Sequence, residues 1–238
     1  MPFSKSQVDR AGRFLAERLV RRREAGESAV EGFNRDRVQE AEGIVEEWRR
    51  AHAKILSSVA ANLRYYVLEH GGTGVAQRLK RHGTIVDKLT REEGMRLTQM
   101  ADIGGVRAVL PTRDAVHAVA RRLRRNWTVV RVRDYIETPK EDGYRALHLI
   151  VRRRGRLIEV QLRTPFQHMW ANMVEDQSRH LQAALKSGEG PDDVLNAYRD
   201  LAETGAKLEA GGESRADLVG VVQAALLLLD TFRKRGMQ

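Results

Sequence analysis

Cysteine is absent from this sequence of 238 residues, and proline (5 residues) and aromatic side chains (5%) are scarce. Without cysteine the chain has no disulfides, no thiolate metal ligands and no cysteine nucleophile. No apolar run approaches the roughly 20 residues of a membrane-spanning helix, and the N-terminal residues lack the apolar core of a signal peptide. We therefore expect no membrane association and a cytoplasmic location.

Positive charge is plentiful instead, because 42 lysine and arginine residues against 32 aspartate and glutamate residues give a formal net charge of +10. The segment 113–163 holds 14 basic and six acidic residues, so about one fifth of the chain carries a net +8. Such a region attracts nucleotide phosphates, nucleic acid or both, or it forms a solvated basic surface. The apolar share of 42% is enough for a sizeable core.

Helices are predicted at both ends of the chain. Apolar residues recur at spacings of three and four over 35–68, which predicts a long helix after a first helix over about 6–23. Ser6 and Asn34 are candidate N-caps, and the glycines of 70–74 end the long helix. Further helices are expected over 114–125, 165–186, 191–209 and 214–235.

The period changes to two in the middle of the chain. Strands are expected over 105–111, 127–133, 145–151 and 156–163, with a tight hairpin at Arg154-Gly155. This pattern predicts an α+β fold, a small mixed β-sheet flanked by N- and C-terminal helices. We divide the chain into an N-terminal helical segment (1–74), a core (75–186) and C-terminal helices (187–238) that pack on the core or serve oligomerisation or partner binding.

The last predicted strand has one apolar face, and its other face carries Glu159, Gln161 and Arg163. Upstream, the segment Asp102-Ile-Gly-Gly-Val-Arg107 places a carboxylate directly before a strand and an arginine off its core face. Asp102 and Glu159, on adjacent parts of one sheet, could share a hard cation with a triphosphate, with arginines holding phosphate oxygens. For the alternation alone, an ordinary exposed sheet face is the alternative.

A polar loop over 133–148 contains Pro139 and Gly143 and is expected to be an exposed connection. Tyr144 offers a stacking surface for a base, and Lys140 offers a partner for phosphate or ribose. The alternative is a hairpin loop with the tyrosine packed at its foot.

Other signals are weak when taken one at a time. Arg78, Lys80 and Lys88 on their own indicate an ordinary basic helix surface. The sequence contains neither GxGxxG nor GxxxxGK[ST], and its seven histidines show no metal-ligand spacing such as HExxH.

Five short motifs nevertheless occur in one order between about Gln77 and Leu181, and together they resemble the synthetase domain of the RelA/SpoT family. They are Arg-x-Lys with Ile-x-x-Lys-Leu (78–89), Asp-Ile-Gly-Gly-Val-Arg (102–107), Arg-Asp-Tyr-Ile-x-x-Pro-Lys-x-x-Gly-Tyr-Arg-x-x-His (133–148), Glu-Val-Gln-Leu-Arg-Thr (159–164) and His-Met-Trp-Ala (168–171). The match covers a little under half of the chain, which is similar to the small, single-domain alarmone synthetases.

The resemblance implies a nucleotidyltransferase-like fold and an ATP-dependent pyrophosphotransferase that uses Mg²⁺. The ribose 3′-hydroxyl of GDP or GTP would attack the β-phosphorus of ATP, so that (p)ppGpp forms and AMP leaves. This chemistry needs metal and positive charge around developing negative charge.

Residue roles follow from the same resemblance. ATP would be bound by Arg78, Lys80 and Lys88. The catalytic residues would be Asp102, Arg107 and Glu159, of which Asp102 and Glu159 hold Mg²⁺ and Glu159 accepts the attacking proton. The acceptor side would be lined by Lys140, Tyr144, His148, Gln161, Arg163 and His168, with Tyr144 stacked on the base. In some small synthetases an asparagine stands in place of His168.

Two other functions stay open. Toxic members of the family pyrophosphorylate the 3′-terminal adenosine of tRNA and block translation, and the concentrated basic region fits such a polyanionic acceptor. A catalytically idle member would act as an RNA-binding or regulatory module. An apolar stripe over 218–229 could pack on the domain, form a homo-oligomer or dock an antitoxin protein.

Overall fold

The computed structural model describes residues 3–26, 28, 32–180, 190, 192–211, 222, 226 and 230. The elements in chain order are α1 (Lys5–Ala25), α2 (Arg35–Glu69), β1 (Gly74–Leu79), α3 (His82–Arg91), η2 (Leu97–Gln99), η3 (Ala101–Ile103), β2 (Gly104–Val109), α4 (Arg113–Asn126), β3 (Val129–Asp134), β4 (Leu147–Arg153), β5 (Arg156–Arg163), α5 (Pro165–His180) and α6 (Asp192–Glu209). The strands form one sheet in the order β1-β2-β5-β4-β3. Only β2 and β5 pair in parallel, so the predicted α+β fold with a mixed sheet is confirmed.

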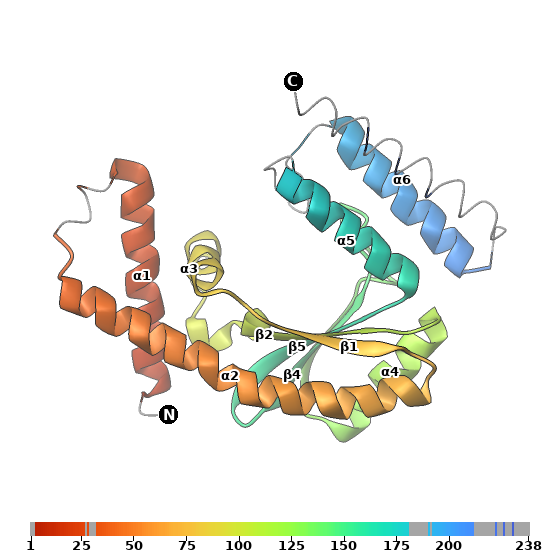
Figure 1. Cartoon of the computed structure of the whole chain (residues 1–238), viewed down its shortest axis with the longest axis horizontal. Helices are drawn as coiled ribbons and strands as arrows, with labels where there is room; N and C mark the ends of the chain where they lie inside the picture. The colour runs from red at the N-terminus through yellow and green to blue at the C-terminus, as the bar shows by residue number, and fades with distance from the viewer. Residues whose placement is uncertain are drawn as a thin grey trace.

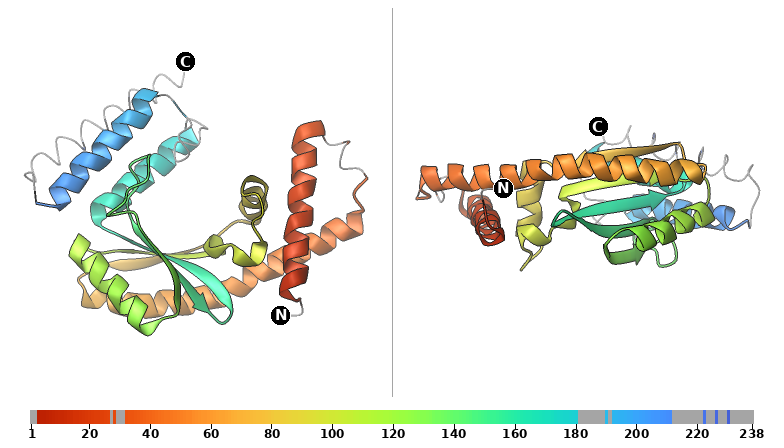
Figure 2. Two further views of the ribbon diagram at one scale, coloured as in Figure 1. Left: turned by 180° about the vertical axis from the view of Figure 1, so that it is seen from behind. Right: turned by 90° about the horizontal axis from the view of Figure 1, so that it is seen from below.

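One face of the sheet is buried under α2 and α4. Apolar residues of these two helices pack with those of the strands into a single core, in which Val106, Leu149 and Val160 are at most 1% exposed. Figure 1 shows α2 running along this face, and Figure 2 shows α4 beside it. Because side chains alternate along a strand, the opposite face is left for the polar residues of the same strands.

Two smaller cores flank this sheet. One joins α1 to the N-terminal half of α2, α3 and η2, and the other joins α5 to α6 and includes Tyr144. The two helical groups stand at opposite ends of the sheet (Figure 1). Asn34 caps α2 as predicted, but α1 is capped by Ser4 rather than Ser6, because Ser4 and Gln7 form a reciprocal capping box.

The structure adds one strand that the sequence pattern did not predict. β1 pairs antiparallel with β2 at the edge of the sheet, and three consecutive residues in it are exposed. An edge strand of this kind lacks the alternation by which strands are recognised. Arg78 therefore lies on a strand and Lys80 directly after it, and the expectation of a basic helix surface was wrong for both; only Lys88 lies on a helix.

The predicted C-terminal helices are seen in part. α6 (Asp192–Glu209) matches the helix expected over 191–209, whereas the helix expected over 214–235 falls on residues outside those described, apart from three single positions. The use of the 218–229 stripe for oligomerisation or antitoxin binding thus stays a prediction. In the ranges that the structure describes, no helix has the length and apolar character needed to cross a membrane.

Candidate active site

Strand register brings most of the predicted residues onto the polar face of the sheet. Arg107 of β2 lies opposite Gln161 of β5, which lies opposite His148 of β4. Two residues along β5, Glu159 lies opposite Gly105 of β2. Paired residues of neighbouring strands project to the same side. The mixed sheet therefore places a guanidinium, an amide, an imidazole and a carboxylate together without any loop.

A hollow of about 320 Å³ lies over this face. It is lined by Ala76, Gln77, Arg78, Lys80, Asp102, Gly105, Val106, Arg107, Glu159 and Gln161. The two adjacent glycines have different roles in it. A Cβ on Gly104 would lie 2.9 Å from Ile158 in the core, whereas a Cβ on Gly105 would meet no atom closer than 3.9 Å. Gly105 thus leaves the floor of the hollow open for a ligand.

Asp102 enters the hollow from η3 and is held by two lysines. The Nζ atoms of Lys80 and Lys88 lie 2.9 and 3.1 Å from its two carboxylate oxygens. Burial alone would raise the pKa of Asp102, but the charges and hydrogen bonds of the two lysines outweigh it and lower the pKa. The group is therefore a carboxylate near neutral pH, and Lys88 also pairs with Glu92 at 3.5 Å.

Glu159 belongs to a closed ring of hydrogen bonds. Its two carboxylate oxygens lie 3.2 Å from His148 Nδ1 and 2.7 Å from the donor Gln161 Nε2. His148 Nε2 lies 2.7 Å from the hydroxyl of Tyr144, and Arg163 Nη2 donates to both Tyr144 (2.7 Å) and Gln161 Oε1 (3.0 Å). Two paths therefore connect Arg163 to Glu159, one through Tyr144 and His148 and the other through Gln161.

Hydrogen-bond polarity fixes one direction in this ring: Arg163 can only donate, so the hydroxyl of Tyr144 accepts from it. The Tyr144 hydroxyl keeps its own proton for donation to His148 Nε2, and in that arrangement His148 carries its proton on Nδ1, facing Glu159. Burial alone would raise the pKa of Glu159, but His148 and Gln161 outweigh it and lower the pKa. The ring thus presents Glu159 as an oriented carboxylate.

Tyr144 does not have the exposed position expected for a base-stacking platform. Its side chain is 6% exposed and packs among Tyr135, His148 and Trp170. Of the two interpretations of the 133–148 loop, the tyrosine packed at the foot of the loop is the one observed. The reason is that the third core, shared with α5 and α6, encloses the ring. Lys140 stays close, with Nζ 5.2 Å from the centre of the Tyr144 ring.

His168 lies in a second hollow, of about 690 Å³, that shares Ala76 and Arg107 with the first. Burial and the charges of Arg107 and Arg163 lower the pKa of His168. The Nδ1 atom of His168, Nε of Arg107, and Nε and Nη1 of Arg163 are buried without a hydrogen-bond partner among the described residues. Burying a polar atom without a hydrogen-bond partner costs free energy of folding, so these atoms mark places where a ligand could supply hydrogen-bond acceptors.

Two residues of α5 that the motifs did not single out complete the site. Asn172 accepts a hydrogen bond from Arg107 Nη1 (3.4 Å) and contacts His168 Nε2 (3.2 Å), and Glu175 lies 3.6 Å from Arg78 Nη1. Positions 168, 172 and 175 share one face of a helix. That spacing, counted from His168, was a signal available in the sequence.

The fold and the site together define an α+β protein with carboxylates and cations gathered over one face of a mixed sheet, an arrangement suited to a ligand that carries phosphates. Comparison with known proteins is more specific. The model of the region found in RelA / SpoT proteins matches residues 77–181. GTP pyrophosphokinase YjbM of Bacillus subtilis is 30% identical over 163 residues, 63% of this chain and 74% of that protein. The chain belongs to the RelA/SpoT family.

Further relatives agree with this assignment. GTP pyrophosphokinase YwaC of Bacillus subtilis is 33% identical over 127 residues, 45% of this chain and 60% of that protein. The crystal structure of small alarmone synthetase 1 from Bacillus subtilis superimposes with a TM-score of 0.59 at 25% identity, covering 76% of this chain and all of that one. A GTP pyrophosphokinase family protein from Streptococcus pneumoniae shares the fold, with a TM-score of 0.61 at 23% identity over 74% of this chain and 95% of that one.

Proposed function

We propose that this chain transfers the β,γ-pyrophosphoryl group of ATP to the ribose 3′-oxygen of GDP or GTP. The 3′-oxygen bonds to the β-phosphorus of ATP, the bond from that phosphorus to the α–β bridging oxygen breaks, and AMP leaves with that oxygen. The proton of the 3′-hydroxyl passes to a base on the protein. The relatives named GTP pyrophosphokinase support the choice of guanine nucleotides as acceptors.

The observation that carries this proposal is the hydrogen-bonded ring around Glu159. A general base must be ionised, oriented and within reach of its proton donor. His148 and Gln161 orient both oxygens of Glu159, and its lowered pKa keeps it ionised at the floor of the hollow. Glu159 is thus the base of this proposal.

The cations around the hollow suit the phosphates of ATP. Lys80 and Lys88 converge within 3.1 Å of the carboxylate of Asp102, and Arg78, with a side chain 63% exposed, stands at the rim. Arg107 separates the two hollows and retains an unpaired Nε–H. Fixed positive charges of this kind stabilise the negative charge that develops on the transferred group.

The residues also fit Mg²⁺ as a cofactor. In the part of the chain that the structure describes, no three His, Asp or Glu side chains form a metal site by themselves. Mg²⁺ in phosphoryl-transfer sites is held by one or two carboxylates together with substrate phosphates, and Asp102 and Glu159 face the same hollow. When bound there, the ion would neutralise phosphate charge; orienting the substrates and accepting the proton remain with the side chains.

The decisive test offers the purified chain γ-labelled ATP with GDP, GTP and tRNA in separate reactions. We expect label in GDP and GTP together with stoichiometric AMP. Glu159→Gln should lower the rate at least about 100-fold while the circular dichroism spectrum is unchanged. Label found in tRNA alone would establish the toxin hypothesis instead, and label in no acceptor would favour the idle regulatory member. A cytoplasmic location belongs to the same proposal.

A further inference from the structure

A third hollow, rich in positive charge, lies away from the candidate active site and shares no lining residue with the two hollows described above. Its volume is about 510 Å³. Three segments form it, namely the N-terminal half of α1, the turn around η2 and the β4–β5 hairpin. The lining residues are Lys5, Ser6, Asp9, Arg10, Arg13, Arg96, Thr98, Gln99, Arg152, Gly155 and Leu157. We propose that this hollow, the α1 hollow, binds a small oligophosphate anion through its phosphate groups.

The charge of the α1 hollow is one-sided. Five of its lining residues are basic and one, Asp9, is acidic. Asp9 is already engaged, because its carboxylate accepts hydrogen bonds from the backbone N–H (2.8 Å) and the hydroxyl (3.0 Å) of Thr98. Within the described residues, no carboxylate forms an ion pair with any of the five basic side chains. Like charges gathered without counter-charges repel one another, and a bound anion relieves that repulsion.

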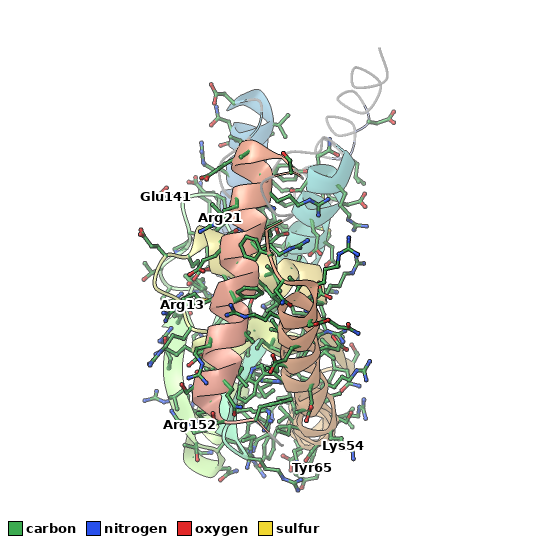
Figure 3. The ribbon with its side chains drawn as sticks, turned by 90° about the vertical axis from the view of Figure 1, so that its left-hand side faces the viewer. Arg13, Arg21, Lys54, Tyr65, Glu141 and Arg152 are labelled. Atoms are coloured by element: carbon green, nitrogen blue, oxygen red, sulfur yellow. The ribbon has the colours of Figure 1, made fainter. Side chains whose placement is uncertain are left out.

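The walls of the α1 hollow are fixed by local structure. The two hydrogen bonds from Thr98 to Asp9 tie η2 to α1. Arg154 and Gly155 have φ angles of 47° and 76°, as a two-residue hairpin turn requires, and this turn sets the position of Arg152. Figure 3 shows Arg13 and Arg152 on the side of the molecule where α1 lies, Arg152 near the N-terminal end of that helix. The cations are therefore brought together by the fold.

The lining chemistry selects phosphate over base. Among the residues that the structure describes, no aromatic side chain lines the α1 hollow, so these residues offer a base no surface on which to stack. Guanidinium and ammonium groups, the hydroxyl of Ser6 and the amide of Gln99 can donate hydrogen bonds to phosphate oxygens, whereas the hydroxyl of Thr98 already donates to Asp9. Five basic residues around one open hollow suit a compact anion of several phosphates. A free oligophosphate and the triphosphate of a nucleotide share this chemistry.

Calorimetric titration with tripolyphosphate, without divalent cations, tests the proposal on the full chain. The candidate active site is also cationic, so the quantity compared is the number of equivalents bound. Wild type should bind one equivalent more than the Arg96→Glu/Arg152→Glu double variant. Lys54→Glu is the matched control, because Lys54 is an exposed basic residue of α2 that lies away from Arg152 in Figure 3. It should bind as wild type does.

A second variant protects the test against misfolding. Arg96→Gln removes one charge without adding another, and it should weaken the additional equivalent on the order of tenfold at an unchanged melting temperature. If the double variant and Arg96→Gln both bind as Lys54→Glu does, the α1 hollow is not an oligophosphate site.

Two competitors identify the source of the phosphate. Displacement of tripolyphosphate from the α1 hollow by GTP would support the triphosphate of a nucleotide as the ligand, and resistance to GTP would support a free oligophosphate. Guanosine, which has no phosphate, should displace nothing. If a single-stranded RNA binds in a way that Arg96→Glu/Arg152→Glu abolishes and tripolyphosphate does not bind, the proposal is overturned in favour of a nucleic-acid surface.

Discussion

Among the single residues of the site, Tyr144 departs most from its expected role, which was to stack its ring on the base of the acceptor. A stacking platform would use the face of the ring, which is enclosed by Tyr135, His148 and Trp170. The structure uses the hydroxyl instead, as the link between Arg163 and His148. Cooperative hydrogen-bond networks lose more than one pairwise contact when a link is removed. We therefore predict that Tyr144 positions Glu159 through His148.

Tyr144→Phe separates the two roles, because it keeps the aromatic ring and removes only the link. We expect kcat to fall about tenfold with little change in KM for the acceptor, since the orientation of His148 and Glu159 is lost while the packing is kept. The matched control is Tyr135→Phe, because Tyr135 shares the aromatic cluster but lies outside the ring. Steady-state kinetics with GDP and GTP measure both. If Tyr144→Phe matched wild type and Tyr144→Ala raised KM alone, stacking would be the correct role.

Sequence reasoning reached the members of this site but not their connections. Alternation along one strand placed Glu159, Gln161 and Arg163 on one face. In the structure all three belong to the hydrogen-bonded ring, in which Arg163 donates to Gln161 and Gln161 donates to Glu159. The hairpin at Arg154-Gly155 predicted β4 as one partner of that strand, whereas the register of its parallel pairing with β2 depends on contacts between distant segments and could not be predicted. The row from Arg107 through Gln161 to His148 follows from register alone.

The elements were predictable in proportion to how regularly they bury one face. α2 and α4 follow a clear apolar period and were expected within two residues of their observed ends. β1 was missed because Ala76, Gln77 and Arg78 are all exposed in succession at the sheet edge. The strand forms because β2 offers it a complete antiparallel partner. Backbone hydrogen bonds between strands do not depend on side-chain type, so the side-chain pattern of β1 does not predict this pairing.

Replacement by alanine should change the free energy of unfolding in opposite directions at two glycines, Gly143 and Gly43. Gly143 has a φ of 86°, and a Cβ there would lie 2.8 Å from Ala202 of α6. Gly43 lies exposed within α2, with open space around a Cβ. Gly143→Ala should lower the free energy of unfolding by about 1–3 kcal/mol, and Gly43→Ala should raise it by about 0.5–1 kcal/mol. Urea unfolding followed by circular dichroism measures both. Equal effects of the two changes would show that α6 does not pack closely against the loop.

Across the whole molecule, the basic segment 113–163 is less available to an external polyanion than its net charge suggests. Arg113 pairs with Glu137 at 2.8 Å and Arg122 with Glu69 at 3.4 Å. The guanidinium of Arg153 lies 4.6 Å from the ring centre of Trp127. Such arginines contribute packing as well as charge. Other arginines of the same segment, among them Arg121, Arg124 and Arg125, remain exposed on α4.

A global property also follows from His52, which lies on α2 where the sheet core meets the core under α1. The side chain is 1% exposed, and its Nδ1 lies 2.8 Å from the carbonyl oxygen of Trp48. Burial lowers the pKa of His52 from 6.5 to about 4, although the Trp48 carbonyl opposes it, and the charge of Arg156 lowers it further. The folded chain therefore keeps this imidazole neutral at a pH where the unfolded chain protonates it.

The stability contributed by neutral His52 is complete above pH 6.5 and is lost as the pH falls from there towards 4, because only the unfolded state takes up the proton in this range. Between pH 7.5 and 5 the loss amounts to about 2 kcal/mol. His52→Phe keeps an aromatic ring beside Trp48 and removes the titration, so its unfolding free energy should fall by about 2 kcal/mol less than that of wild type over the same interval. Urea unfolding of both chains at the two pH values measures this difference, from which the contributions of all other titrating groups cancel. An equal fall in the two chains would mean that water reaches His52 and that the junction between the two cores opens in the native state.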